Sequence, residues 1–130
     1  MPRRPLQDVI ITDSSVLARN MYQLLFSSQN RFRVRFVEEY ETLFKRSPRL
    51  RPDLMIVNSN SLAENQPLRF PCPAILVISR NRFDIKENTV GLDRVLVIEK
   101  PFYPYDLLAM AHKLIQEPAK KRTRKRKKNV

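Results

Sequence analysis

Side chains that commonly carry catalytic chemistry are scarce in this chain of 130 residues. Cys72 is the only cysteine and His112 the only histidine, which excludes or disfavours a disulfide framework, a Cys/His zinc site and a Cys–His nucleophile pair adjacent in sequence. Gly91 is the only glycine, whereas phosphate-binding loops such as GxGxxG need several glycines for close backbone approach. These counts indicate a protein that is not an enzyme and has no cofactor.

Positive charge is concentrated at one end of the sequence. The formal net charge is +12, from 25 Lys and Arg against 13 Asp and Glu. The last eleven residues, KKRTRKRKKNV, contain eight cations and no acid, which leaves 17 cations and 13 acids for residues 1–119. The eight cations are Lys120, Lys121, Arg122, Arg124, Lys125, Arg126, Lys127 and Lys128.

This composition predicts a disordered tail, because like charges repel and none of the residues 120–129 is apolar. Clustered cations can neutralise phosphates and release counterions, so we expect the tail to bind nucleic acid or another polyanion in a salt-sensitive way. An anionic membrane surface is a less favoured partner. The tail has no aromatic residue to stack on bases, so sequence readout is not expected. The alternative is a terminus that only aids solubility.

The length allows one folded domain. We expect a basic arm over residues 1–7, a folded domain over 8–117 and the tail over 118–130. Apolar runs are too short to span a bilayer, and the first residues lack the apolar run of a signal peptide. The expected location is therefore the cytoplasm.

Five short segments have the composition of β-strands, at residues 8–12, 31–37, 53–57, 74–78 and 94–98. Four of them are continuously apolar, which predicts parallel strands buried on both faces. In the second segment Phe32, Val34 and Phe36 alternate with arginines. That alternation is typical of an edge strand with one face in water.

Helical patterns lie between these segments. Ser14 or Ser15 can cap a helix, and one face of that helix carries Leu17, Met21, Leu24, Leu25 and Ser28. A shorter helix is expected over residues 39–45. A last helix is expected from residues 104–106 to a point before Pro118, with inward positions Leu107, Leu108, Ala111, Leu114 and Ile115.

The remaining connections have weaker patterns. Residues 58–73 contain three prolines, so we expect a loop with at most one helical turn around 62–66, and a short helix is possible near 84–88. Alternating strands and helices of this length predict an α/β fold with a doubly wound parallel sheet and right-handed crossovers.

In this order and spacing, four motifs resemble the receiver domain of two-component response regulators. They are VIITDSSVLARNMYQLL, RPDLMIVN, AILVIS and VIEKPF, and the resemblance covers about residues 8–116. It implies a three-layer flavodoxin-like (CheY-like) fold whose five strands have the order 2-1-3-4-5. It also implies that the bond before the proline of VIEKPF is often cis.

The resemblance further implies a phosphorylation pocket. In receivers, an acidic pair and a third-strand aspartate hold Mg²⁺, that aspartate accepts the phosphoryl group, and a hydroxyl and a lysine contact the phosphate. These positions fall on Thr12, Asp13, Asn58, Ser79 and Lys100, with Pro101 following the lysine. Only Asp13, Ser79 and Lys100 have the receiver's side chains.

The departures predict a degenerate pocket. An amide at Asn58 is a poor nucleophile, so an acyl phosphate there is not expected. One carboxylate beside a threonine and an amide makes a weak Mg²⁺ site, so no bound metal is expected. We expect Lys100 to pair with Asp13 in the vacated pocket and the Ser79 hydroxyl to cap or bond the following loop. Val97 replaces the aromatic residue that swings inward when receivers are activated.

The leading hypothesis is a phosphorylation-independent pseudo-receiver that binds a signalling protein and is tethered to a polyanion by its tail. The resemblance places the partner surface on residues 80–93, the fifth strand and the last helix, where a homodimer is also possible. Two rivals remain open. One is a response regulator with a non-standard phosphoryl acceptor. The other is a non-specific DNA- or RNA-binding protein whose folded body only dimerises.

Overall fold

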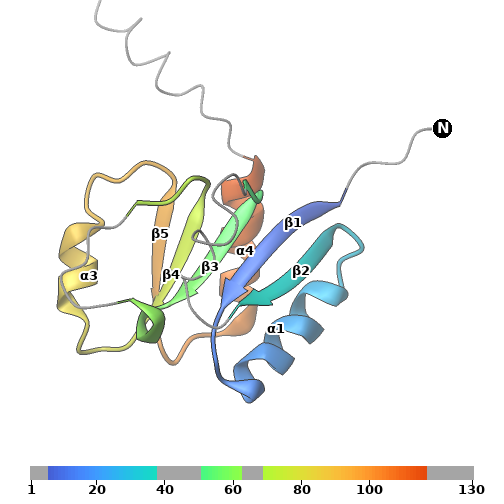
Figure 1. Ribbon diagram of the computed structural model, residues 1–130, viewed down its shortest axis with the longest axis horizontal. Helices are drawn as coiled ribbons and strands as arrows, with labels where there is room; N and C mark the ends of the chain where they lie inside the picture. The colour runs from blue at the N-terminus through green and yellow to red at the C-terminus, as the bar shows by residue number, and fades with distance from the viewer. Residues whose placement is uncertain (1–5, 38–50, 63–68, 117–130) are drawn as a thin grey trace, which may run out of the picture.

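The computed structural model describes residues 6–37, 51–62 and 69–116. Strands and helices alternate along the chain (Figure 1). In order, the elements are β1 (Gln7–Thr12), α1 (Val16–Ser27), β2 (Phe32–Val37), β3 (Leu54–Asn58), a 3₁₀ turn η1 (Ser59–Ser61), β4 (Ala74–Ile78), α3 (Phe83–Asn88), β5 (Val95–Glu99) and α4 (Pro104–Gln116).

The five strands form one sheet in the order β2-β1-β3-β4-β5, and every neighbouring pair is parallel. This is the strand order that the resemblance to receiver domains implies. Because all strands run the same way, their carboxyl ends lie at one edge of the sheet, where the arrowheads point in Figure 1. The predicted strand limits differ from the observed ones by at most one residue at each end.

Helices cover both faces of the sheet. Side chains of α1 and α4, including Phe26, Leu107 and Leu114, pack in one core cluster with Val9, Ile11 and other residues of the strands. Ile85 of α3 packs in a second cluster with residues of β3 and β4 that point the other way. Alternate side chains of each central strand therefore contribute to different cores, as expected for the predicted three-layer arrangement.

The two edge strands differ from the central ones. In β2, Phe32 packs edge-on against Phe26 at 5.1 Å between ring centroids, and Arg33 and Arg35 are exposed and both reach Asp8 of β1. Strand β5 was expected to be buried on both faces, but only Ile98 is buried and the other four residues are half-buried. The reason is its place at the edge, where β4 covers one side only.

The buried face of α1 agrees with the prediction only in part. Leu25 is buried as predicted and Met21 packs against the core, but Leu17 and Leu24 are 80% and 73% exposed, and Tyr22 and Phe26 are buried instead. Both sets recur at three- or four-residue spacing, so helical periodicity alone cannot choose between two neighbouring stripes. The stripe with the two aromatic rings is buried because Phe26 meets Phe32 of β2. Ser15 is the N-cap, and its hydroxyl accepts a hydrogen bond from the Ala18 N–H at 3.2 Å.

Other predicted helices have mixed outcomes. Helix α4 is confirmed, with Leu107, Leu108, Ala111 and Leu114 buried, and α3 begins one residue earlier than predicted. The predicted helix at 39–45 lies outside the described residues, as does most of the turn expected around 62–66. A turn occurs earlier, at η1, because the Asn58 side chain accepts a hydrogen bond from the Asn60 N–H. In the described part of the chain, no helix is long and apolar enough to cross a bilayer.

Candidate functional site

A cavity of about 700 Å³ opens at the carboxyl edge of the sheet, beside the start of α1. Its lining includes Asp13, Asn58, Ser79, Lys100 and Pro101, which follow or end four different strands. The cavity therefore unites five of the six residues that the receiver resemblance assigned to a degenerate phosphorylation pocket. The sixth, Thr12, is fully buried at the end of β1 and is not part of the lining.

Asp13 and Asn58 form the polar floor of the cavity. Asn58 Nδ2 donates a hydrogen bond to Asp13 Oδ2 at 2.8 Å, and the Ser15 N–H donates to Asp13 Oδ1 at 2.9 Å. Asn58 Oδ1 accepts from the Asn60 N–H at 2.9 Å. Asp13 and Asn58 are only 4% and 7% exposed. Both oxygens of the buried carboxylate thus have donors, and so does the amide oxygen.

The expected ion pair between Lys100 and Asp13 is not formed. Among the described residues, the Lys100 ammonium has no carboxylate partner, and Asp13 is satisfied by an amide and a backbone N–H. Strand order explains this difference. Asn58 ends β3, which lies directly beside β1, whereas Lys100 follows β5, and β3 and β4 lie between. The lysine is held in place through its backbone, since its N–H donates to the Ile78 carbonyl at 2.8 Å, and the Lys100–Pro101 bond is cis.

The expected role of the Ser79 hydroxyl is also not observed. In the part of the chain that is described, this hydroxyl makes no hydrogen bond, and it is the Ser79 carbonyl that accepts from the Arg82 N–H at 3.1 Å. The loop after β4 is therefore closed by backbone contacts. The hydroxyl lies at the cavity wall with its hydrogen-bonding capacity unused.

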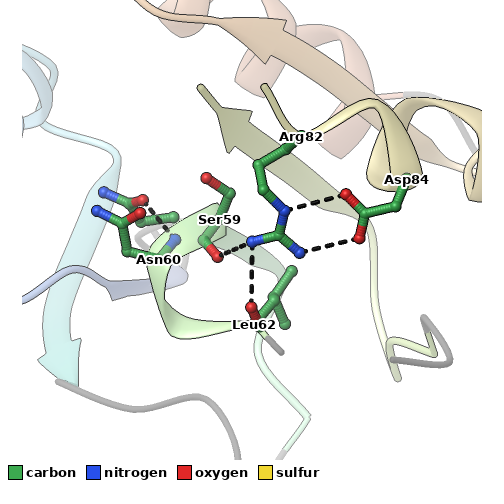
Figure 2. A network of polar contacts seen from close by, with 6 residues as sticks. Ser59, Asn60, Leu62, Arg82 and Asp84 are labelled. Atoms are coloured by element: carbon green, nitrogen blue, oxygen red, sulfur yellow. Dashed lines mark hydrogen bonds and ion pairs between the residues drawn. The ribbon is translucent and has the colours of Figure 1, made fainter. Parts of the chain in front are cut away.

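Arg82, which sequence reasoning did not single out, joins two loops at this edge (Figure 2). Its Nη1 donates to the Ser59 carbonyl at 2.8 Å and to the Leu62 carbonyl at 3.2 Å. Its Nε and Nη2 each donate to one oxygen of Asp84 at 3.0 Å. The guanidinium thereby connects the end of β3 to the start of α3. The only sequence signal is an arginine two residues before an aspartate, which is too common to be diagnostic.

The donor set does not fit Mg²⁺, the metal that the receiver resemblance implies. Mg²⁺ needs several oxygen ligands in octahedral array, usually including more than one carboxylate or phosphate. Here Asn58 turns its Nδ2 toward Asp13, and both Asp13 oxygens accept hydrogen bonds. In the described residues, no group of three or more His, Cys, Asp or Glu side chains could hold a metal ion.

Two titratable groups are perturbed by burial. Burial, and secondarily the charge of Asp13, raises the pKa of Tyr22 well above its usual range. Burial raises the pKa of the Cys72 thiol to about 12, with a smaller upward effect from Asp53 and opposing effects from Arg94 and Arg51. Cys72 is therefore a protonated thiol at neutral pH, which is the unreactive form.

Solved structures similar to this chain are receiver domains and proteins that contain them. A signal receiver domain of an HD domain-containing protein from Pseudomonas fluorescens Pf-5 aligns with a TM-score of 0.73 at 14% identity, over 95% of this chain and 97% of that one. A response regulator from Thermotoga maritima aligns with a TM-score of 0.65 at 20% identity, over 86% and 99%.

Full-length FixJ from B. japonicum aligns with a TM-score of 0.68 at 20% identity over 91% of this chain, which spans 63% of that protein. Neither a protein-family model nor a curated protein sequence matches the chain. The similarities confirm the CheY-like flavodoxin fold. The polyanion-binding residues expected between Lys120 and Lys128 lie outside the described residues.

Proposed function

We propose that this protein is a phosphorylation-independent pseudo-receiver that acts as a protein-interaction module in signalling. The observation that carries the proposal is the Asn58–Asp13 hydrogen bond of 2.8 Å in the cavity where receivers bind Mg²⁺ and phosphate. An amide here supplies no nucleophilic carboxylate. By donating to Asp13, it also replaces the interaction that a cation would make.

A fixed arrangement of the surrounding loops supports the same proposal. Arg82 bonds the carbonyls of Ser59 and Leu62 on one side and Asp84 on the other. Charge-assisted bonds of this kind are stronger than neutral ones, and Arg82 and Asp84 are largely shielded from water, with side chains 12% and 21% exposed. The two loops next to the cavity are thus connected without any phosphoryl group. In this proposal the folded domain binds its partner in a single conformation, and phosphorylation does not change that conformation.

Exposed apolar residues beside β5 support the partner surface that the sequence suggests. Phe83 of α3 is 65% exposed and Val90 is 82% exposed. Tyr105 at the start of α4 is also exposed, and β5 itself is an edge strand with half-buried side chains. Exposed apolar side chains are a feature of many protein-binding surfaces. We propose that a signalling protein, or a second copy of this chain, docks here, while the basic tail tethers the assembly to nucleic acid or another polyanion.

Treatment with a phosphodonor tests the proposal. The full chain is incubated with acetyl phosphate and Mg²⁺, and its mass is measured without acid or heat that would hydrolyse an acyl phosphate. We expect no mass increase and no change in amide resonances with beryllofluoride. A stable phosphoprotein would instead support the rival in which another carboxylate accepts the phosphoryl group. The Asn58→Asp variant is a matched control because it restores a carboxylate at the missing position.

A further inference from the structure

The cavity extends beyond its polar floor into an apolar region. Its lining includes Leu17, Ala18 and Met21 from the first turns of α1, together with Phe102, which lies between β5 and α4, and Pro104, the first residue of α4. A volume of about 700 Å³ lies within the range of small-molecule sites, which are concave and lined mainly by apolar side chains with a few polar groups. Leu17 is largely exposed although it lines this cavity.

Cations outnumber acids on the cavity wall. Lys100 and Arg80 both line it, and neither makes an ion pair with any of the described residues. Among the described residues that line the cavity, Asp13 is the only acid, and both of its oxygens already accept hydrogen bonds from within the fold. The Ser79 hydroxyl is a further donor without a partner in the described structure. The polar end of the cavity is therefore complementary to an anion.

From these observations we propose that the cavity binds a small amphiphilic carboxylic acid. Its carboxylate lies between the Lys100 ammonium, the Arg80 guanidinium and the Ser79 hydroxyl, and its apolar body lies between Leu17, Met21 and Phe102. An inorganic phosphate would contact only the cationic end of the cavity, and the apolar side chains of the lining would stay exposed to water. A neutral apolar ligand would leave the two cations without a counter-charge. The site goes beyond the proposed interaction module and does not depend on it.

Three probes separate the contributions of charge and apolar body. Octanoate has both, acetate has only the carboxylate, and octanol has only the chain. Each is titrated into the full-length chain, and binding is followed by the amide resonances of residues 15–21, 79–80, 100 and 102–103. We expect saturable shifts with octanoate and at least about tenfold weaker binding of acetate and octanol. The cations of the tail attract both carboxylates, so the residue-specific shifts in the cavity are the readout.

Variants with matched controls locate the site. Lys100→Met is expected to reduce octanoate affinity to about that of octanol, whereas Lys113→Met removes an exposed lysine outside the cavity lining and leaves affinity unchanged. Leu17→Asp is expected to weaken binding about tenfold or more. Leu24→Asp adds the same charge to the same helix outside the cavity lining and should have no effect.

Three outcomes would overturn the proposal. They are unsaturated shifts with octanoate, equal shifts over unrelated exposed apolar residues such as Phe83 and Val90, and unchanged affinity in Lys100→Met. None of them bears on phosphorylation. A failure of this site is therefore distinguishable from a failure of the proposed function, which the phosphodonor experiment tests separately.

Discussion

At the scale of single residues, one amide determines the chemistry of the cavity floor. Asn58 can both donate and accept, and it does so, with Nδ2 on Asp13 and Oδ1 on the Asn60 N–H. A carboxylate at this position could only accept, and it would lie within hydrogen-bond distance of the Asp13 carboxylate. The amide therefore stabilises Asp13 in a buried place where a receiver would need a cation.

Asn58→Asp should replace the hydrogen-bonded pair of Asn58 and Asp13 with two carboxylates whose stability in the fold depends on a bound cation. We expect the variant to be about 2–4 kcal/mol less stable, because it buries a second carboxylate beside Asp13 and removes the amide donor to Asp13 Oδ2. Mg²⁺ at about 10 mM should restore several degrees of its melting temperature, since a ligand of the folded state stabilises by RT ln(1 + [L]/Kd). Thermal melts with and without Mg²⁺ check this, and the original chain should not respond. Asn60→Asp is the control for an added charge at an exposed neighbour. An equal response of both variants would show that the effect is non-specific.

Alkaline pH should destabilise the protein through Cys72 and Tyr22. Burial raises the pKa of both groups in the folded state, for Cys72 from 9.0 to about 12 and for Tyr22 above its ordinary 10.0. The unfolded chain therefore releases protons that the folded chain keeps, and the free energy of unfolding falls as pH rises above about 9. Urea denaturation at a series of pH values measures the slope. Tyr22→Phe, which removes one of these protons, should make the decline less steep, and an unchanged slope would contradict the assignment.

At the scale of elements, the sheet edge is joined by contacts that do not depend on a ligand. Arg82 connects η1 to α3, the Asn58 side chain caps η1, and the Lys100 N–H bonds to the last residue of β4. The first and third of these contacts join segments that belong to or follow different strands, and the second fixes the turn that follows β3. Together they hold the cavity rim while leaving its Lys100 and Arg80 side chains available.

Arg82→Met should loosen this edge. It removes the hydrogen bonds from Arg82 to the carbonyls of Ser59 and Leu62 and both of its contacts to Asp84, and we expect a loss of about 2–3 kcal/mol in the free energy of unfolding. Amide hydrogen exchange should accelerate most at residues 59–62 and 83–85. Arg80→Met is the matched control, because Arg80 is exposed and forms no ion pair in the described structure. If both variants were equally stable, the Arg82 contacts would have no net stabilising effect.

At the scale of the whole molecule, charge is unevenly distributed along the chain. Eight of the 25 cations fall in the last eleven residues, and the rest of the chain is close to neutral. A folded module that binds a protein and a separate cationic segment that binds a polyanion would act independently. Removing the segment should therefore affect one interaction and not the other.

Truncation after Pro118 should abolish polyanion binding without unfolding the domain. The last buried residue of α4 is Leu114, which precedes the cut, so the melting temperature should be unchanged. For the full chain on random duplex DNA, each neutralised phosphate contributes about 0.9 to the slope of log K against log salt, and we expect a slope magnitude of roughly 3 to 6. Gel retardation at two salt concentrations gives this slope. Unchanged binding by the truncated chain would show that the tail does not bind DNA. If the full chain did not bind at low salt, the tail would be a terminus that only aids solubility.

The strands and the helices α1, α3 and α4 could be predicted from local patterns of the amino-acid sequence. Continuous apolar runs at 74–78 and the alternation in 32–37 are local patterns, and local periodicity reflects whether one or both faces of a strand are buried. The receiver motifs then placed Asp13, Asn58, Ser79, Lys100 and Pro101 at one edge, and all five line one cavity.

Which of these residues are partners depends on how the strands and helices pack together. Lys100 and Asp13 have opposite charges, which made an ion pair the natural expectation, but two strands separate β5 from β1, and the adjacent Asn58 meets Asp13 instead. The buried stripe of α1 was likewise set by contact of Phe26 with Phe32, a residue six positions away on another element. The Arg82 contacts join residues about twenty positions apart. Such pairings depend on distances between elements, and a one-dimensional pattern of apolar and charged residues does not contain those distances.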